Sequence, residues 1–568
     1  MNPLFSLTPG TARTQGASSA FLSAPQKIFT LIALFAISLF AYRNAMDVQV
    51  PTDSFLFMHS LKTFGAGGLM NNFYDIGLTP VADSILFVLF KLFGTHTTGW
   101  FLSAIFLHSL NAFLIILVGF QLNTAFSLNS SRALAFAPGL LFLLSPFQTE
   151  VILWTPRIVN YSIAVVFLLL SVYYMIKYSR AEKNIQLLLF HLFFVCAILS
   201  FETALCFPAI PVCYFLFLRF VQGAAIRIRS ILLKILLPQT AILFLYFLTC
   251  KLWLGEWILH YGASAHLSFS PTLVAGTLVK YLAKFLLFYR YLPDSRHDFL
   301  HGLLQTDISN SITVWILMAV LLLLGSFLFF RLFQKNKNGT VLLLLLLLSF
   351  LITLVPVINL DTTFVGAIFT DRYGYLPSVF FYLLITTSIY MLLKRIWGVI
   401  TCFLLVICCL CLSATIPVWQ EASDYSKRLM TNYEPFIAER NVLVLNMPDN
   451  CNWIMTYRNG FTQGASLAFG KTPRDINEIA GFSMTSVNDS VNVTYDGSKS
   501  IRVESMPRKK SFLYNGRWGK SMETAEYSLT FDQDLIAYTL VFKNDIPADA
   551  CILYVAGDNW RKIKLGPI

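Results

Sequence analysis

Charged residues are scarce in this chain of 568 residues: they make up 13% of it, while hydrophobic residues make up 56%. An average soluble domain has about 25% charged and about 45 to 50% apolar residues. The composition therefore excludes an ordinary soluble protein and indicates a polytopic membrane protein. No small-residue cleavage site follows the first apolar run, which argues against a removable signal peptide. Residues 1–26, rich in Ser, Thr, Ala and Gly, are expected to form a flexible cytoplasmic tail.

Acidic residues are the rarest charged groups in the first three quarters of the chain. Residues 1–417 contain 13 Asp and Glu against 25 Lys and Arg, whereas residues 418–568 contain 17 of each sign. The whole excess of +12 therefore belongs to the apolar part. Because basic residues mark the cytoplasmic loops of membrane proteins, this excess indicates membrane orientation and not nucleic-acid binding.

Apolar stretches in the first 416 residues predict a helical transmembrane domain over 27–416 with about eleven spans, each able to cross about 30 Å of hydrocarbon. With eleven spans the basic loops share one side, the N-terminus is cytoplasmic and the C-terminal region lies outside. Two more apolar stretches, 81–94 and 271–293, are expected to lie along the outer surface as interfacial helices, with a true span as the alternative for the second. The eleven stretches lie near 27–42, 97–122, 133–149, 158–177, 185–200, 204–220, 234–253, 312–331, 340–358, 378–393 and 397–416.

The pattern changes after Trp419 to short alternating segments separated by turn residues. It predicts an extracytoplasmic, β-rich α+β domain over 417–568. Turns are expected at Asp496-Gly497 and Asn515-Gly516, and one helix after Thr472-Pro473. The predicted strands are 442–445, 491–495, 501–504, 527–531, 536–542 and 551–555.

Two cysteines and several aromatic residues of this domain leave alternatives open. Cys451 and Cys551 are its only cysteines, and on the oxidising side of a membrane they either pair as a disulfide or remain free. The aromatic side chains either fill the core or contact carbohydrate. They are Trp453, Tyr457, Trp518 and Trp560.

The predicted topology gathers the acidic residues of the membrane part on its outer side and leaves only Glu182 inside. Carboxylates beside hydrocarbon are costly, so a group of them supplied by several loops indicates a polar chamber where chemistry or binding takes place. The twelve outer residues are Asp47, Asp53, Asp75, Asp83, Glu150, Glu202, Glu256, Asp294, Asp298, Asp307, Asp361 and Asp371.

The first outer loop offers a candidate general base. Thr52 is placed to cap a short apolar helix that begins at Asp53. A carboxylate in the first turn of a helix is fixed in position and favoured in its ionised form, as a general base must be. A plain helix-start aspartate is the alternative, and Asp47 is a second candidate in the same loop.

Four further stretches, in this order and on this side of the membrane, resemble the GT-C glycosyltransferases, in particular the transmembrane protein O-mannosyltransferases and their bacterial relatives. The resemblance covers about residues 28–415 and not the C-terminal domain. The stretches are His-Ser-Leu-Asn-Ala-Phe at 108–113, Leu-Ser-Pro-Phe-Gln-Thr-Glu-Val-Ile-Leu-Trp at 144–154, Phe-Glu-Thr-Ala at 201–204 and Asp-Arg-Tyr-Gly-Tyr-Leu-Pro-Ser at 371–378.

The resemblance implies inverting transfer of one sugar from a polyprenyl-phosphate carrier to a hydroxyl acceptor on the outer face. It places the base at Asp53 or Asp47, because Thr52-Asp53 stands where the family often has two adjacent acids. Ser145 and Gln148 stand where histidines are usual, and Glu150 keeps its place.

The departing phosphate gains negative charge, so it needs fixed cations, and arginine suits bidentate contact with phosphate. Arg372 is the first candidate, followed by Arg157 and Arg290; each is otherwise an interfacial anchor. The other residues expected to bind donor or acceptor are Glu150, Glu202, His297, Asp298, Asp371 and Tyr373.

A metal site is a weaker interpretation of one loop. His297 and His301 stand four residues apart with Asp298 between them, which resembles a zinc-binding helix only loosely. A monophosphate leaving group does not require a divalent ion, so no cofactor is expected. These residues are interpreted instead as loop residues near the substrate.

Two rival functions stay open beside the transferase. A flippase or transporter for lipid-linked sugars would place ionisable residues near the bilayer midplane, and an inactive scaffold would bind a partner through the outer domain. For the transferase we expect a lipid-linked sugar, a hydroxyl acceptor and membrane lipids as partners, and no nucleic acid. The expected location is the bacterial inner membrane, with the C-terminal domain in the periplasm.

Overall fold

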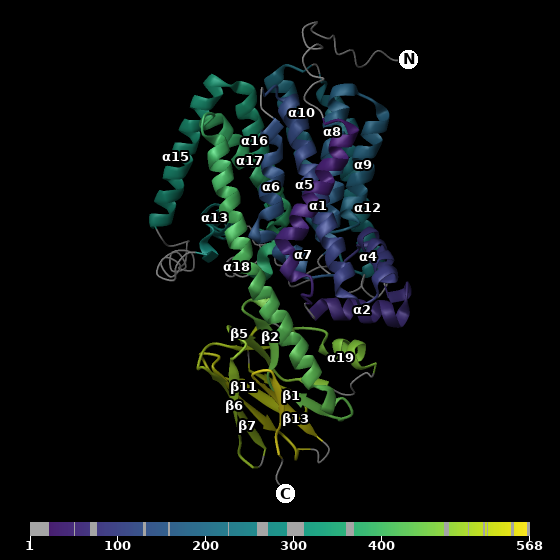
Figure 1. Ribbon diagram of the computed structural model, residues 1–568, viewed down its shortest axis with the longest axis vertical. Coiled ribbons are helices and arrows are strands. Elements are labelled where there is room, and N and C mark those ends of the chain that lie inside the picture. Colours follow the sequence, from purple (N-terminus) through teal and green to yellow (C-terminus); the bar gives the residue numbers. More distant parts are fainter. Residues whose placement is uncertain are drawn as a thin grey trace.

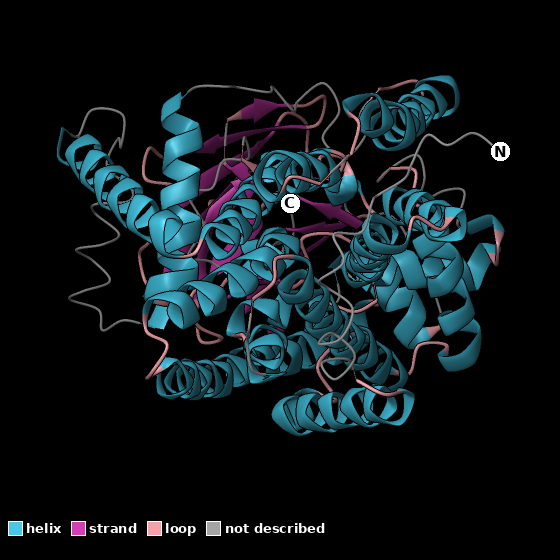
Figure 2. Ribbon diagram, turned by 90° about the horizontal axis from the view of Figure 1, so that it is seen from above, coloured by secondary structure: helices cyan, strands magenta, loops and turns pink. Residues whose placement is uncertain are grey.

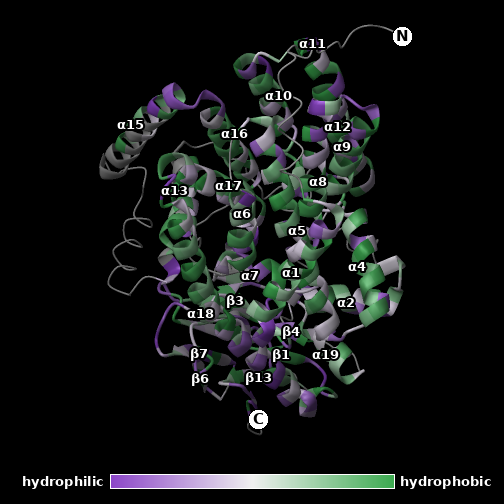
Figure 3. Cartoon of the chain, turned by 45° about the horizontal axis from the view of Figure 1, so that its top comes forward, coloured by the Kyte–Doolittle hydropathy of each residue, from purple (hydrophilic) through white to green (hydrophobic). Residues whose placement is uncertain are grey.

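A computed structural model shows a bundle of long helices above a β-rich C-terminal domain (Figure 1). Hydropathy separates the two parts: apolar residues dominate the helices, and hydrophilic residues are frequent among the strands (Figure 3). The structure describes residues 22–49, 52–68, 77–128, 132–156, 159–224, 226–257, 271–291, 312–358, 368–470, 476–497, 499–514, 517–519, 521–546 and 550–564.

Eight helical segments among the described residues are long and apolar enough to cross a membrane, and a bent ninth qualifies if its two halves form one span. This agrees with an integral membrane protein, but the expected number of eleven is not confirmed. The bundle helices are α1 (Ala24–Tyr42), α5 (Thr97–Ala125), α6 (Arg132–Leu144), α8 (Val159–Ala181), α9 (Asn184–Ile198), α10 (Ala209–Gln222), α12 (Leu237–Leu254), α15 (Ile312–Lys335), α16 (Lys337–Leu354), α17 (Tyr375–Leu392) and α18 (Trp397–Asn432).

The bent segment runs from α6 through the 3₁₀ turn η3 (Pro146–Gln148) into α7 (Thr149–Leu153), with a change of direction of 58°. Pro146 explains the break, because proline has no N–H for the helix ladder and disfavours helical geometry at the preceding Ser145. Ser145 starts the new turn by accepting a hydrogen bond from the Phe147 N–H at 3.3 Å. The chain after the break thus leaves the direction of the bundle.

Three shorter helices accompany the bundle: α2 (Thr52–Phe64), α4 (Pro80–Phe93) and α13 (Pro271–Leu287). The last two match the stretches expected to be interfacial helices. Helix α2 lies across the end of the bundle that faces the C-terminal domain (Figure 1). It begins at Thr52 itself, and the Thr52 hydroxyl has no hydrogen-bond partner among the described residues. The expectation that Thr52 caps this helix is therefore wrong.

The C-terminal domain contains three sheets, with strand orders β14-β13-β1-β4, β10-β11-β12-β7-β6 and β3-β2-β5-β8-β9. Seen from above, the strands lie beneath the helices (Figure 2). The strands are β1 (Val442–Val444), β2 (Met447–Cys451), β3 (Ile454–Met455), β4 (Ile476–Glu478), β5 (Gly481–Met484), β6 (Ser490–Tyr495), β7 (Ser500–Met506), β8 (Phe512–Tyr514), β9 (Arg517–Trp518), β10 (Met522–Glu523), β11 (Tyr527–Phe531), β12 (Ala537–Phe542), β13 (Cys551–Ala556) and β14 (Asn559–Lys562).

All six predicted strands are present, and β6 and β7 pair antiparallel across the predicted Asp496-Gly497 turn. The expected Asn515-Gly516 turn lies outside the described residues. The helix expected after Thr472-Pro473 is wrong: the described chain resumes as strand β4, which pairs parallel with β1. The helix of this domain is instead α19 (Phe461–Phe469), ahead of that position.

Helix α18 joins the two parts as 36 continuous residues, so the expected boundary at residue 417 lies inside a helix. Its first half supplies Cys408 and Leu412 to the core of the bundle. Its second half supplies Leu429 and Met430 to the core of the C-terminal domain. One continuous helix therefore belongs to both cores.

A second connection is the contact between α2 and α19. The Thr52 N–H donates to the Thr456 carbonyl at 2.9 Å. A Cβ on Gly460 would lie 2.7 Å from the Thr52 carbonyl oxygen, and one on Gly464 would lie 2.3 Å from the Phe55 ring. The absence of side chains at these glycines allows the domain to approach α2 closely.

Gly460→Ala should loosen this contact. Gly460 has φ +81° and backbone oxygen in the way of a Cβ, whereas Gly497 has the same φ and open space around it. Both alanine variants bear the cost of a left-handed residue, about 1 kcal/mol. We expect Gly460→Ala to lower the unfolding temperature more than Gly497→Ala and to speed hydrogen exchange in α2. Equal shifts in the two variants would contradict the close docking.

Of the two alternatives for Cys451 and Cys551, the structure has the unpaired one: both thiols are free and buried. They lie in β2 and β13, which belong to different sheets. Burial raises the pKa of the Cys451 thiol to about 12, which keeps it protonated and unreactive.

Both thiols should therefore resist modification in the folded protein. Non-reducing peptide mass spectrometry should recover the two cysteines unlinked, and a charged maleimide should label them only after denaturation. A peptide pair linked through Cys451 and Cys551 would show that this description of the domain core is wrong.

Candidate functional site

The bent segment delivers Glu150 to the end of the bundle near the C-terminal domain, where α7 lies (Figure 1). The Glu150 carboxylate is fully buried and forms an ion pair with the Arg372 guanidinium. It also accepts a hydrogen bond from the Arg372 backbone N–H at 2.6 Å. Arg372 belongs to the 3₁₀ segment η9 (Ile368–Gly374), directly ahead of α17. Sequence reasoning named both residues as candidates, and the structure makes them partners.

Asp371, next to Arg372, is also fully buried and holds two cations. Arg290 donates to it in a bidentate way, at 2.9 Å from Nη1 to Oδ2 and 2.7 Å from Nη2 to Oδ1. The Lys284 ammonium, at the end of α13, forms a second ion pair with Asp371. Lys284 was not singled out as a site residue. Its position inside an otherwise apolar run was the available signal, since a charge there needs a buried partner.

Aromatic rings surround the cations of this group. The Arg372 guanidinium carbon lies 4.6 Å from the Tyr373 ring centroid and 5.1 Å from that of Trp154, and its Nη2 donates to the Tyr373 hydroxyl at 3.0 Å. Phe147 lies under the other two cations, 5.5 Å from the Arg290 guanidinium carbon and 5.6 Å from the Lys284 nitrogen. Cation–π attraction is strongest where water is excluded, so these rings help to stabilise each cation in its position.

We call Glu150, Lys284, Arg290, Asp371 and Arg372 the charge cluster. Three cations face two carboxylates, which leaves an excess of one positive charge. The two carboxylates and the lysine are at most 1% exposed, whereas the two arginine side chains are 13 to 14% exposed. The two arginine side chains are therefore the parts of the cluster that solvent or a ligand can reach.

Asp53 lies in the first turn of α2 and belongs to a different set of contacts. Its Oδ1 accepts a hydrogen bond at 3.0 Å from the side chain of Asn459, in the C-terminal domain. Asp47 has an exposed side chain, and its backbone carbonyl accepts a hydrogen bond from Lys427 at 2.5 Å. Helices α2 and α7 lie at the same end of the bundle (Figure 1). The charge cluster and Asp53 thus share this end, and Asp53 is joined to the C-terminal domain.

The other predicted site residues do not join the charge cluster in the described structure. Glu202 starts the turn before α10 and accepts a hydrogen bond from the Tyr246 hydroxyl at 3.4 Å. Arg157, His297 and Asp298 lie outside the described residues. Within the described ranges no group of three or more His, Cys, Asp or Glu is arranged to hold a metal.

The motif residues at 108–111 and at 375 meet in a buried polar network. The Tyr375 hydroxyl lies 3.0 Å from Nδ1 of His108 and 2.9 Å from the Ser162 hydroxyl, and Asn111 donates to it at 3.2 Å. Three side chains, two on α5 and one on α8, therefore share the hydroxyl of Tyr375 on α17. In the interior of the bundle such a network fixes the positions of helices, because an unpaired polar group there is costly.

Ser145 and Gln148 serve the same structural purpose. Tyr382 donates to the Ser145 hydroxyl at 2.7 Å, and Gln148 donates to the Ser378 hydroxyl at 2.9 Å. Both bonds hold the bent segment against α17, whose preceding turn carries Asp371 and Arg372. Ser145 and Gln148 thus support the geometry of the charge cluster without belonging to it.

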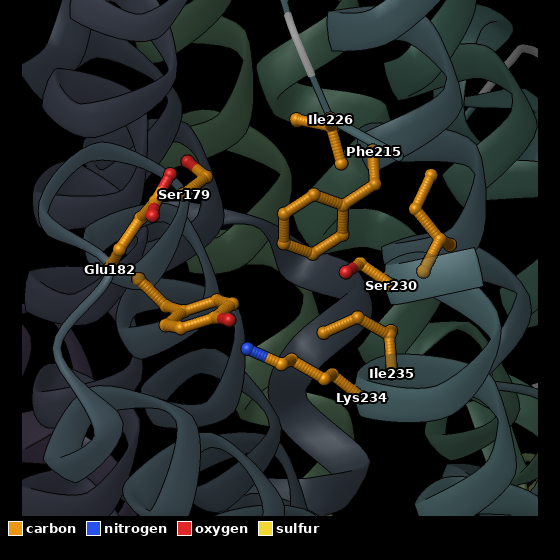
Figure 4. Close-up of a pocket in the computed structure, with 9 residues that line it drawn as sticks. Ser179, Glu182, Phe215, Ile226, Ser230, Lys234 and Ile235 are labelled. Atoms are coloured by element: carbon orange, nitrogen blue, oxygen red, sulfur yellow. The ribbon is translucent and has the colours of Figure 1, made fainter. Parts of the chain in front are cut away.

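A polar cavity of about 630 Å³ lies between α2 and the C-terminal domain, and Asn459, the partner of Asp53, lines it. Its volume falls within the range of about 300 to 1,000 Å³ typical of ligand sites. A second cavity, of about 30 Å³, lies beside α8 and α10, with Glu182 and Lys234 on opposite walls (Figure 4). That space holds about a single water and is too small for a sugar.

Asp371→Asn should destabilise the protein strongly, because it leaves the buried Lys284 and Arg290 without their counter-charge. Breaking a buried ion pair typically costs about 3–5 kcal/mol. Asp424→Asn is the matched control: its carboxylate is 60% exposed and lies 3.8 Å from Lys427, so its loss should cost less than about 1 kcal/mol. Unfolding of the detergent-purified variants measures both. Similar shifts would contradict the buried pairing.

The arrangement combines a buried charge cluster with an excess cation, a half-buried aspartate on a rigid helix, and a polar cavity beside that aspartate. Such a set of groups suits the binding of an anionic headgroup next to a base and a polar second substrate. No protein-family model and no curated protein matches this chain.

Proposed function

We propose that this protein is an integral-membrane glycosyltransferase that moves one sugar from a polyprenyl-phosphate carrier to a hydroxyl acceptor. The observation that carries the proposal is the charge cluster, with its excess positive charge and its two partly exposed arginines, at the end of the bundle that also holds Asp53. The order of the sequence motifs supports the same reaction.

The lipid phosphate is assigned to Arg290 and Arg372. A guanidinium carries its N–H donors in a planar fork, which matches the geometry of phosphate oxygens. The carboxylates of Glu150 and Asp371 keep both arginines in place before the substrate arrives. Such preorganised cations stabilise charge as it develops on the leaving group.

The proposed reaction is a single displacement at the anomeric carbon of the sugar. The acceptor oxygen attacks the anomeric carbon and forms the new glycosidic bond, while the bond from that carbon to the phosphate oxygen breaks and its electron pair leaves with the phosphate. The acceptor proton passes to a carboxylate. Attack from the face opposite the phosphate inverts the anomeric centre.

Asp53 suits the role of base better than Asp47. It sits in the first turn of a helix, which fixes its position, and Asn459 orients it. The Asp47 side chain is exposed. Its loop is held by backbone bonds to α18 and not through the carboxylate: Lys427 binds the Asp47 carbonyl, and the Gln49 N–H donates to Ser423.

One observation favours the rival transporter. The bent segment α6–η3–α7 is a broken helix beside buried ionisable groups, and broken helices form the binding sites of many transporters. In that case the charge cluster would bind the headgroup and release it on the other side of the membrane, and no glycosidic bond would form.

Asp53→Asn should abolish transfer and leave donor binding intact. The purified protein would be incubated with a panel of labelled polyprenyl-phosphate sugars, and glycans from a deletion strain would be analysed by mass spectrometry. Loss of a general base typically costs about 10²- to 10⁴-fold in rate, whereas Asp47→Asn and the exposed control Asp424→Asn should stay near wild type. Unimpaired turnover in Asp53→Asn, or translocation without transfer, would overturn the proposal.

A further inference from the structure

The cavity between α2 and the C-terminal domain is built around a bidentate ion pair. Arg458 Nε and Nη2 lie 2.8 and 2.7 Å from the two Asp449 oxygens, and Asn450 donates to the same carboxylate at 2.9 Å. The Asp449 side chain is 3% exposed and that of Arg458 is 23% exposed. Among the described residues Arg458 bonds only Asp449, so guanidinium donors remain for a ligand.

Other polar groups complete the wall. Asn459 faces the cavity and also bonds Asp53. Gln463, on α19, is half-buried, and Glu478 ends strand β4 at the cavity. Neither of these two side chains has a hydrogen-bond partner within the described part of the chain. Tyr514 and Leu56 add apolar surface.

The charges in the wall exclude several ligand classes. Two carboxylates, Asp449 and Glu478, face one guanidinium. Desolvation and the neighbouring Asp449 raise the pKa of Glu478 to about 7, so near neutral pH the wall is neutral to slightly negative and offers phosphates and uronic acids no excess cation. Its polar groups are too many for a lipid tail, since each would lose water without gaining a partner. Planar carboxylate, amide and guanidinium groups, each able to bond two neighbouring hydroxyls, suit an uncharged sugar, whose C–H face would pack on apolar surface.

We infer that this cavity binds the acceptor of the reaction, and that the acceptor is a neutral sugar chain whose terminal hydroxyl is presented to Asp53. This inference rests on the proposed function. Asn459 is the link: it lines the cavity on one side and orients the base on the other. Because α19 is closely docked on α2, the distance between acceptor site and base is set by packing.

The test uses the full-length protein in nanodiscs and two cavity variants, Gln463→Ala and Glu478→Gln. Neither change breaks a bond within the described structure. Glu526→Gln, an exposed acid elsewhere in the same domain, is the matched control. Binding is measured without donor, using fluorescently labelled oligosaccharides of neutral hexoses, with uronic-acid oligosaccharides as the charged comparison. Transfer and donor hydrolysis are then measured with a labelled polyprenyl-phosphate sugar.

We expect neutral oligosaccharides to bind and charged ones not to bind, with affinity reduced about fivefold to tenfold in each cavity variant, as for the loss of one or two hydrogen bonds. The KM for acceptor should rise by the same factor, while donor hydrolysis stays at the wild-type level. Asp53→Asn should show the opposite: normal oligosaccharide binding and no transfer.

Three results would overturn the inference. These are no binding of any neutral oligosaccharide, binding that both cavity variants retain in full, or transfer whose acceptor KM is unchanged in the variants. Cavity-dependent binding without any turnover of donor would instead overturn the proposed transferase and with it the acceptor role. The binding and turnover arms therefore separate the two failures.

Discussion

Buried charge must be neutralised, and this requirement shapes the end of the bundle nearest the C-terminal domain. Glu150 and Asp371 are fully buried, and each is held by cations from distant parts of the chain. These groups come together because the break after α6, the turn ahead of α17 and the end of α13 lie close to one another. Only the arginine side chains of the cluster are partly exposed. The ion pairs that stabilise the cluster therefore also determine that the arginines are the groups a ligand can contact.

The C-terminal domain is tied to this end through several independent contacts. Helix α18 contributes to both cores, α19 docks on α2 through closely approached glycines, and strand β3 lies against η9. Asp53 lies between the two parts, on a membrane-proximal helix but bonded to Asn459 of the domain. A site formed by both parts suits two different substrates, one attached to a lipid and the other dissolved in water.

Local patterns predicted the apolar helices near their observed positions and six of the strands, but not the partners of these elements. Alternation located β6, β7 and β11 because each has one buried face, a property of the segment alone. The helix signal at Thr472-Pro473 failed because β4 is selected by parallel pairing with β1, which no local pattern records. The same limit applies to the site: Glu150 and Arg372 were recognised singly, while their pairing and the part played by Lys284 depend on contacts over more than 80 residues of sequence.

The continuity of α18 has a mechanical consequence. A helix that runs unbroken from the bundle into the domain couples the tilt of the bundle to the domain beyond it, and Pro417 marks the place where this helix bends most easily. Bilayer thickness sets such tilts, because a span longer than the hydrocarbon leans to fit. The angle that the cavity mouth makes with the membrane plane is thus a property of the lipid as well as of the protein.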